Sequence, residues 1–275
     1  MSLSIETMVI KAGKAERHYW RDLWRYRELL GFLALRDIKV RYKQAVLGAS
    51  WALIQPAVTT VIFTVVFGRL ANMPAGGIPY PLIVMSGLLG WQLFANALSG
   101  SSASLVSNSS LISKVYFPRL LVPFSCLGVA LIDFLIVLGL FLLVNLWFGY
   151  FPSWHWLVLP GFILMALSTA LGVGLWMTAL TVKYRDFRFV VPFLLQVGIF
   201  ISPVGFRTDY FPNWRGILDL NPMTAVIDGF RWCLLAGEQD LRVSSILTGA
   251  GVIIVLLVSG IWFFRKTERG FADVI

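Results

Sequence analysis

The sequence holds few side chains of the kinds that perform covalent or metal chemistry. Its two histidines, His18 and His155, stand far apart, and its two cysteines, Cys126 and Cys233, form no CxxC pair. The patterns GxxxxGKS/T and HExxH, which cradle nucleotide phosphates and bind zinc, do not occur in it. We therefore expect no catalytic residue, no metal site and no cofactor in this chain, and we do not expect it to be an enzyme by itself.

One acid, Asp133, lies deep inside an apolar stretch at positions 120–148. An ionisable group in such a place is a candidate functional residue, and a proton site is one interpretation. A proton carrier would also need a basic or histidine relay, which the sequence does not supply. The alternative is a hydrogen bond to a hydroxyl or amide group on a neighbouring helix. The role of Asp133 stays open at this stage.

Composition sets the class of protein that must position these residues. The chain has 275 residues, of which 58% are hydrophobic and 13% charged, with a mean hydropathy of +0.78. Soluble domains carry about 25% charged residues, so a helical membrane protein with several spans fits best. The net charge of +9 is compatible with nucleic-acid binding. Here, however, the charges sit in short runs between apolar segments, so we expect membrane lipids and not nucleic acid as partners.

Six apolar stretches are long enough to cross a bilayer as helices, which takes about 20 residues. In the fourth of them, Gly161, Gly172 and Gly174 predict close packing against another helix. The sequence therefore predicts an all-α integral membrane protein with six transmembrane helices, at 45–67, 80–98, 120–148, 157–182, 189–206 and 245–264.

Basic residues predict the orientation of these spans. If the N-terminus is cytoplasmic, all but five of the 23 Lys and Arg residues lie on the inner side. The positive-inside rule then places both termini in the cytoplasm. We expect an N-terminal arm with an interface helix at 1–44, a six-span domain at 45–264 and a cytoplasmic tail at 265–275. The outer five are Arg69, Arg207, Arg215, Arg231 and Arg242.

The interface helix is predicted from a basic run before the first span. At 100° per residue, Leu35, Ile38, Tyr42 and Ala45 share one side of a helix, whereas the cations fall on another. A basic amphipathic helix of this kind lies along a membrane surface, near anionic headgroups. The residues assigned to it are Arg36, Lys39, Arg41, Tyr42 and Lys43.

The inner loop at 99–119 is predicted to end the preceding helix in a Ser/Gly/Asn stretch and then to form a short amphipathic turn. It is either a plain connector or a docking surface for a cytoplasmic partner, because its apolar side chains are expected to be exposed. The turn consists of Leu111, Ile112, Ser113, Lys114, Val115, Tyr116 and Phe117.

The outer loop at 207–242 is longer than a turn needs. Asp219, Asp228 and Arg231 make it too polar to span easily, and Asn221-Pro222 and Gly229 are expected to break it. We predict two short helices that lie at the interface or dip back into the outer leaflet, and we reject a seventh span.

Aromatic side chains are frequent in the predicted spans. Most Trp and Phe residues in membrane helices face lipid or the interface. Flat rings also stack on the apolar faces of pyranoses, so a tunnel for a sugar chain would use them as well. Periodicity does not separate the two interpretations. The candidate channel residues are Trp51, Phe63, Phe67, Trp91, Phe94 and Phe200.

The order of these features resembles a known family. The run R-Y-x-x-x-x-L-G-x-x-W from Arg41 to Trp51, the run V-x-F-P-R from Val115 to Arg119 and the tripeptide Asn221 to Met223 are similar to the permease subunit of ABC-2-type polysaccharide exporters. That group serves O-antigen, capsule and teichoic acid export in the bacterial inner membrane. The resemblance covers nearly the whole chain.

The resemblance implies a homodimer that binds two copies of a separate ATPase subunit, which would hold ATP and Mg. It implies that 111–117 is the coupling helix on that ATPase and that 36–43 gates the cytoplasmic mouth. It also implies that 207–235 forms the periplasmic re-entrant helices. Spans one and five would line the channel, which favours Trp51, Phe63, Phe67 and Phe200 among the rings.

Three functions stay open at the level of sequence. The leading one is export of a polysaccharide or lipid-linked glycan. A permease of the same type that exports a lipid or a drug would lack a ladder of channel aromatics. A membrane-embedded acyltransferase would show a catalytic His or Asp near one surface, and the sequence shows no such pair.

Overall fold

The computed structural model describes residues 19–43 and 48–271, and every regular element in these two ranges is a helix. Five helical stretches are long and apolar enough to cross a bilayer. They are Trp51–Leu70 (most of α3, Gly48–Phe63, with the π-helical η1, Thr64–Leu70), α4 (Tyr80–Ser107), α6 (Leu121–Trp147), Trp154–Lys183 (η2, Trp154–Val158, and α7, Leu159–Lys183) and α11 (Val243–Thr267).

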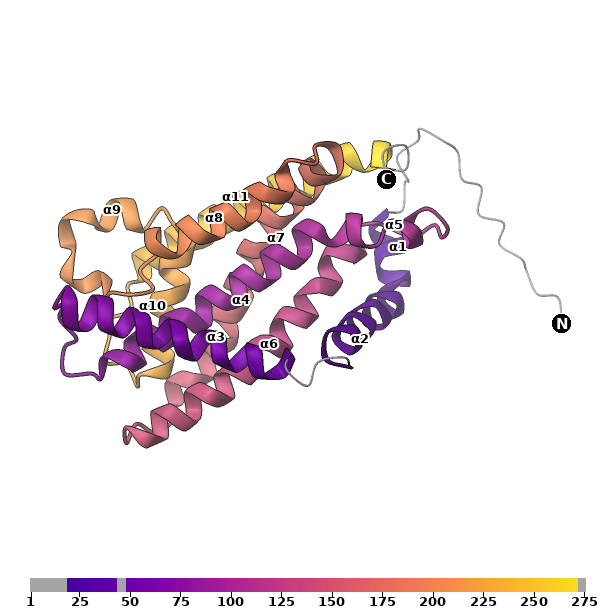
Figure 1. Ribbon diagram of the computed structural model, residues 1–275. Coiled ribbons are helices and arrows are strands. Elements are labelled where there is room, and N and C mark those ends of the chain that lie inside the picture. Colours follow the sequence, from indigo (N-terminus) through magenta and orange to yellow (C-terminus); the bar gives the residue numbers. More distant parts are fainter. Residues whose placement is uncertain (1–18, 44–47, 272–275) are drawn as a thin grey trace.

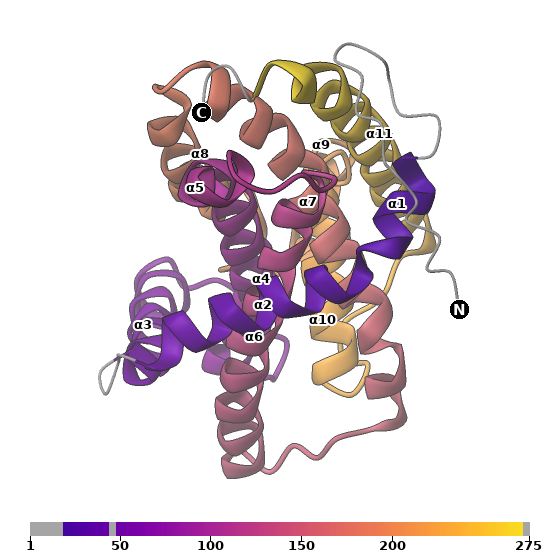
Figure 2. The same cartoon turned by 90° about the vertical axis from the view of Figure 1, so that its right-hand side faces the viewer.

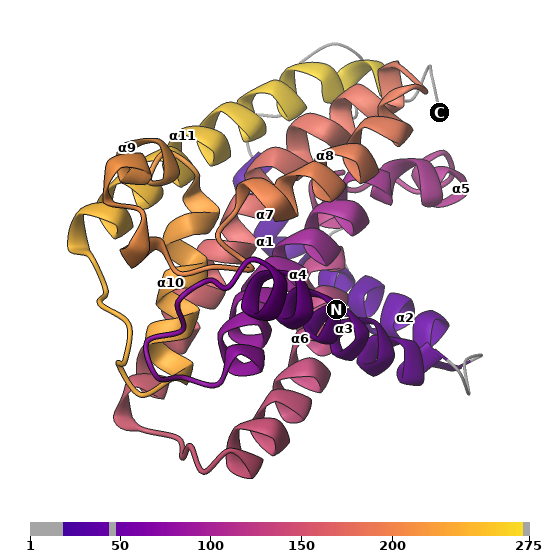
Figure 3. The same cartoon turned by 60° about the vertical axis from the view of Figure 1, so that its left-hand side comes forward.

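Helix α4 forms the centre of the fold. Nearly all of its side chains from Leu82 to Leu98 are buried, and α6, α7 and the short helix α10 (Pro222–Leu234) pack around it. Helices α3 and α8 (Phe187–Ile201) also pack against it and leave most of their own surfaces open (Figures 1 and 3). The prediction of an all-α integral membrane protein is confirmed by this arrangement.

The second span extends beyond its predicted end. Helix α4 continues through the Ser/Gly/Asn stretch to Ser107 instead of ending near Leu98. Serine hydroxyls bond back to carbonyls of the same helix, as Ser101 does to Leu98 and Ser104 does to Ser101, at 3.2 and 2.6 Å. Serine interrupts a helix when its hydroxyl draws the backbone into another conformation, but here the hydroxyls are satisfied within the helix.

The fifth predicted span, 189–206, corresponds to a helix of only 15 residues, α8. At 1.5 Å per residue it covers about 22 Å, which is short of the roughly 30 Å hydrocarbon layer. Residues 202–205, which follow it, are buried and irregular. Their carbonyls must find hydrogen-bond donors within the protein. One donor is the Arg231 side chain, described below, which bonds to the Val204 carbonyl.

Two of the three glycines in the fourth span confirm the close packing predicted there. A Cβ on Gly172 would lie 2.9 Å from the Leu256 carbonyl carbon of α11, and one on Gly174 would lie 2.2 Å from the Ser101 Oγ of α4. Gly161 has nothing within 4 Å of that position, so the prediction is wrong for it.

The outer segment folds as η3 (Thr208–Tyr210), η4 (Pro212–Trp214), α9 (Arg215–Leu218) and α10. Asn221 begins α10, because its side-chain oxygen accepts a hydrogen bond from the Met223 N–H at 3.0 Å. Gly229 does not break this helix, contrary to expectation, but gives room to the ring of Phe162. With 13 mostly buried residues, α10 is too short to cross the membrane.

At the opposite end, α1 (Tyr19–Arg25) and α2 (Arg27–Lys43) run across the bundle and α2 packs on α6 (Figure 2). A second apolar core lies beneath them and joins residues that are distant in sequence. Its members include Tyr19, Leu33, Leu105, Phe117, Leu175, Phe264 and Phe271.

Candidate functional site

The predicted interface helix is part of a longer helix, α2, which begins at Arg27. The exposed residues Phe32, Leu35 and Val40 line one open hollow together with Arg36, Lys39 and Lys43. Leu35 therefore lies at the border of the basic face, between Lys39 on one side and Tyr42 on the other. The helix turns another face to α6, where Leu33 is buried and Ala34 lies close to Gly128. Ala45 lies outside the described residues.

Asp133 on α6 has three hydrogen-bonding partners. Its Oδ2 lies 2.6 Å from the Arg41 Nη2 and accepts a bond from the Asn96 Nδ2 at 3.2 Å. Its Oδ1 accepts a short bond from the Tyr42 hydroxyl. Burial, and then this bond to Asp133, raises the pKa of Tyr42 to about 12, so the phenol stays a donor at neutral pH. The sequence interpretation of an acid without a basic partner is wrong, because α2 brings Arg41 to it.

The predicted coupling turn contains one short helix, α5 (Ser109–Ile112), followed by an irregular segment. We call residues 109–117 the docking loop. Ser113, Lys114, Val115 and Tyr116 are exposed, and Tyr116 keeps 43% of its surface accessible. Ile112 and Phe117 were expected to be exposed but are buried in the second core, because the loop folds back onto the bundle.

Both ends of the docking loop are held by other parts of the chain. Before it, the Asn108 side-chain oxygen accepts a bond from the Arg36 guanidinium of α2. After it, the Arg119 N–H donates to the Glu268 carboxylate at 3.0 Å, and the Tyr19 hydroxyl donates to the same oxygen at 3.4 Å. Burial raises the pKa of Glu268 and also that of Tyr19. The loop is thus fixed to α2 on one side and to the C-terminal turn on the other.

Five of the six candidate channel rings come together at the junction of α3, α4 and α8. Phe63 stacks on Phe200 with ring centres 6.0 Å apart and contacts Phe67 at 5.4 Å. Trp91 and Phe94 lie 5.3 Å apart and are buried, and a Cβ on Gly198 of α8 would lie 2.7 Å from the Trp91 ring. Phe200 leaves 61% of its surface open.

Trp51 does not join this cluster. It is exposed near the start of α3, twelve residues before Phe63. Twelve residues of α-helix span about 18 Å, so the two rings lie at different depths of the membrane.

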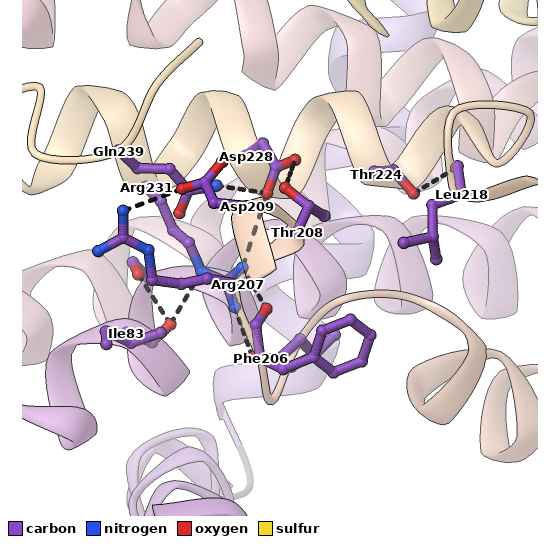
Figure 4. Close-up of polar contacts among 12 residues, drawn as sticks. Ile83, Phe206, Arg207, Thr208, Asp209, Leu218, Thr224, Asp228, Arg231 and Gln239 are labelled. Carbon is purple, nitrogen blue, oxygen red and sulfur yellow. Dashed lines mark hydrogen bonds and ion pairs between the residues drawn. The ribbon is translucent and has the colours of Figure 1, made fainter. Parts of the chain in front are cut away.

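The sequence interpretation missed the most buried charge of the described chain, Arg231 on α10, which has 0% of its surface exposed. Its guanidinium donates to the Val204 and Phe206 carbonyls at 2.7 Å each and to the Ile83 carbonyl at 3.2 Å (Figure 4). These bonds satisfy the irregular backbone after α8. A usable signal existed, since Asp228 and Arg231 are spaced i,i+3 and would share one face of a helix.

Asp228 completes this outer cluster. Its Oδ1 lies 3.7 Å from the Arg231 Nη1 and accepts a bond from Gln239 at 2.7 Å, while its Oδ2 accepts from Thr208 at 2.7 Å (Figure 4). Every oxygen of the carboxylate therefore has a donor, which makes the cluster a structural support of the outer face.

His155 is stacked on Trp154, with ring centres 4.1 Å apart, and its Nδ1 lies 2.9 Å from the Ser153 hydroxyl. His18 lies outside the described residues. Within 19–43 and 48–271, no three His, Cys, Asp or Glu side chains gather in a way that holds a metal ion.

These helices define a polytopic α-helical integral membrane protein. The chain belongs to the ABC-2 type transporter family. The sequence profile of this family matches residues 28–235, from α2 to the end of α10. It is similar to O-antigen export system permease proteins RfbA of Myxococcus xanthus and Klebsiella pneumoniae. The first is 26% identical over 258 residues, 93% of this chain and 98% of the relative, and the second 27% over 252 residues, 90% and 95%. The polysialic acid transport protein KpsM of Escherichia coli is 26% identical over 245 residues, 86% of this chain and 92% of the relative.

Proposed function

We propose that this chain is the membrane-spanning subunit of an ATP-driven exporter that moves a polysaccharide or lipid-linked glycan across the bacterial inner membrane. The similarity to O-antigen export permeases and to a polysialic acid transport protein, over most of both chains, supports this substrate class. Two copies of the chain would form the translocation path. Two copies of a separate ATPase subunit would bind ATP and Mg, since no phosphate-binding loop occurs in this sequence.

The observation that carries the proposal is the docking loop. Its exposed side chains, Val115 and Tyr116, project from a segment whose two ends are anchored, by Asn108 to α2 and by Arg119 to the C-terminal turn. An aromatic side chain on a fixed support is the kind of group that dominates protein interfaces. Work done by a cytoplasmic ATPase would enter the membrane part through this contact.

The aromatic cluster suggests where the glycan would pass. Phe200 on α8 is open and Phe67 on η1 is half-buried, and the apolar helices α3 and α8 leave much of their surface exposed. Facing a second copy, this open surface would form one wall of the path, with rings that stack on sugar faces. Phe63, Trp91 and Phe94 are buried within the protomer, so we assign them to the support behind this wall and not to sugar contact.

The test is co-purification of the ATPase with Tyr116→Ala, together with an assay of surface glycan. Truncation of an interface anchor costs about 2 kcal/mol, which weakens affinity roughly 30-fold and should lose most of the ATPase and the exported glycan. The matched control is Tyr184→Ala, because Tyr184 is 49% exposed, compared with 43% for Tyr116, and lies in the other inner loop. Loss of the ATPase from Tyr184→Ala alone would contradict the assignment of the docking loop.

Substrate class is tested in the same strain. A null mutant should lose surface polysaccharide and accumulate it inside the cell. Normal surface polysaccharide in the null mutant would favour the alternative, a lipid or drug exporter of the same family.

A further inference from the structure

Asp133 is a buried charged residue that has no role in the glycan export mechanism proposed above. Only 4% of its side chain is accessible, and it lies halfway along α6, a membrane-spanning helix. A carboxylate at this depth is costly unless donors surround it. Its donors come from two other elements, Arg41 and Tyr42 from α2 and Asn96 from α4.

The two donors from α2 are consecutive residues in its last turn, next to the first span. Arg41 keeps 51% of its side chain accessible, so it reaches from the surface inwards to Asp133. The guanidinium of this ion pair is therefore half solvated, whereas the carboxylate is buried. Opening the pair returns the guanidinium to water but leaves the buried carboxylate with Asn96 as its donor, so the open state is costly and requires an input of energy.

The same helix has a second polar contact at a different point. Arg36 binds Asn108, the residue that ends α4 and precedes the docking loop. Arg36 and Arg41 are five residues apart, which is about 7.5 Å along the helix axis. Movement of the docking loop would therefore reach α2 through Arg36, while Asp133 holds its C-terminal end.

We propose that Asp133 is a positioning residue that latches the C-terminal end of α2 to the bundle, and that transport requires the release of Arg41 and Tyr42 from it. This inference rests on the proposed function, because it gives the latch a place between the ATPase contact and the opening of the cytoplasmic end. With an arginine, a phenol and an amide as its partners, the carboxylate acts as a fixed anchor and not as a proton carrier.

The experiment measures hydrogen exchange of the full-length protein, co-purified with its ATPase in lipid nanodiscs. In Asp133→Asn, amides in 33–43 should exchange at least tenfold faster, while those of α10 keep their wild-type rate. Lys39→Gln is the matched control, because it removes a charge from an exposed face of the same helix and leaves the contacts of Asp133 intact. Asp133→Glu should restore at least part of the protection.

A double-mutant cycle separates a latch from a general packing role. If Asp133 acts through Arg41, the variant with both Arg41→Gln and Asp133→Asn should exchange no faster in 33–43 than Asp133→Asn alone. Additive effects, or wild-type exchange of 33–43 in Asp133→Asn, would overturn the latch. The ATPase should co-purify with Asp133→Asn at the wild-type level while glycan export falls at least tenfold. Failure of the wild type to bind the ATPase would contradict the proposed function instead, and the exchange data would still test the latch.

Discussion

Buried charges in this chain are held by partners that come from distant parts of the sequence. Arg231 of α10 satisfies carbonyls of α4 and of the segment after α8, and Asp133 of α6 is held by α2 and α4. Each buried ion costs several kcal/mol to desolvate, and that cost is offset only when all its hydrogen-bonding positions are used. These residues therefore join elements that are distant in the sequence, with Asp133 halfway along α6 and Arg231 on α10.

Glu268 should make the stability of the protein depend on pH. Its pKa is raised by burial, so the folded protein binds this proton more tightly than the unfolded chain. Its contribution to stability is then full below the ordinary value of 4.5 and is lost as pH rises through the raised pKa. Relative to Glu268→Gln, the melting temperature of the wild type should fall as pH rises from 5 towards neutrality. Thermal unfolding in detergent at several pH values measures this.

The control for that experiment is Glu28→Gln, because Glu28 is an exposed carboxylate on α2. The melting temperature of Glu28→Gln should change with pH in the same way as that of the wild type. A constant difference between the wild type and Glu268→Gln across the range would contradict a raised pKa at Glu268.

Among the elements, apolar length and period predicted most of the helices but not their ends. The spans 80–98 and 120–148 lie within or close to α4 and α6, whereas α4 runs nine residues further because its serines bond within the helix. The end of α8 at Ile201 has a local signal in Pro203, because helices usually end at or before the residue that precedes a proline. The support of the backbone after it could not be predicted from local sequence, since Arg231 follows these residues by more than twenty positions.

The sequence named candidate site residues, but it could not supply their contacts. The spacing of Arg36 to Lys43 indicated a basic helix, but periodicity contains no information on the helix against which it packs. The pairing of Arg41 with Asp133, and the burial of Phe117, depend on tertiary packing between α2, α6 and the second core. Local sequence patterns do not predict long-range contacts of this kind.

The packing of α7 against α11 should depend on two facing glycines. A Cβ on Gly260 would lie 2.5 Å from the Gly172 carbonyl oxygen, which is backbone and has little room to shift. Gly260→Val should therefore separate the two helices and destabilise the protein by about 1–3 kcal/mol. Gly251→Val on the same helix is the matched control, since nothing lies within 4 Å of its Cβ position. Thermal unfolding of both variants in detergent measures the difference, and equal melting temperatures would contradict close packing at this point.

The whole molecule has two polar ends separated by helices with open apolar surfaces. The docking loop, α1 and the C-terminal turn share one end, and α9 lies at the other (Figure 1). Basic residues are concentrated at the first end. Lys183 ends α7 there, Arg185 lies between α7 and α8, and Arg188 is in the first turn of α8. From the positive-inside rule we predict that this end is cytoplasmic.

That orientation predicts which positions a membrane-impermeant maleimide reaches from outside the cell. In a variant whose Cys126 and Cys233 are replaced by serine, a single cysteine at Trp154 or Asn213 should be labelled, and one at Lys114 or Arg185 should be labelled only after the membrane is opened. All four side chains are exposed, so the difference reports the side of the membrane and not burial. The labelling after permeabilisation is the control for reactivity. Outside labelling at Lys114 would place the docking loop in the periplasm, away from any cytoplasmic ATPase, and would contradict both the orientation and the proposed route by which energy enters the chain.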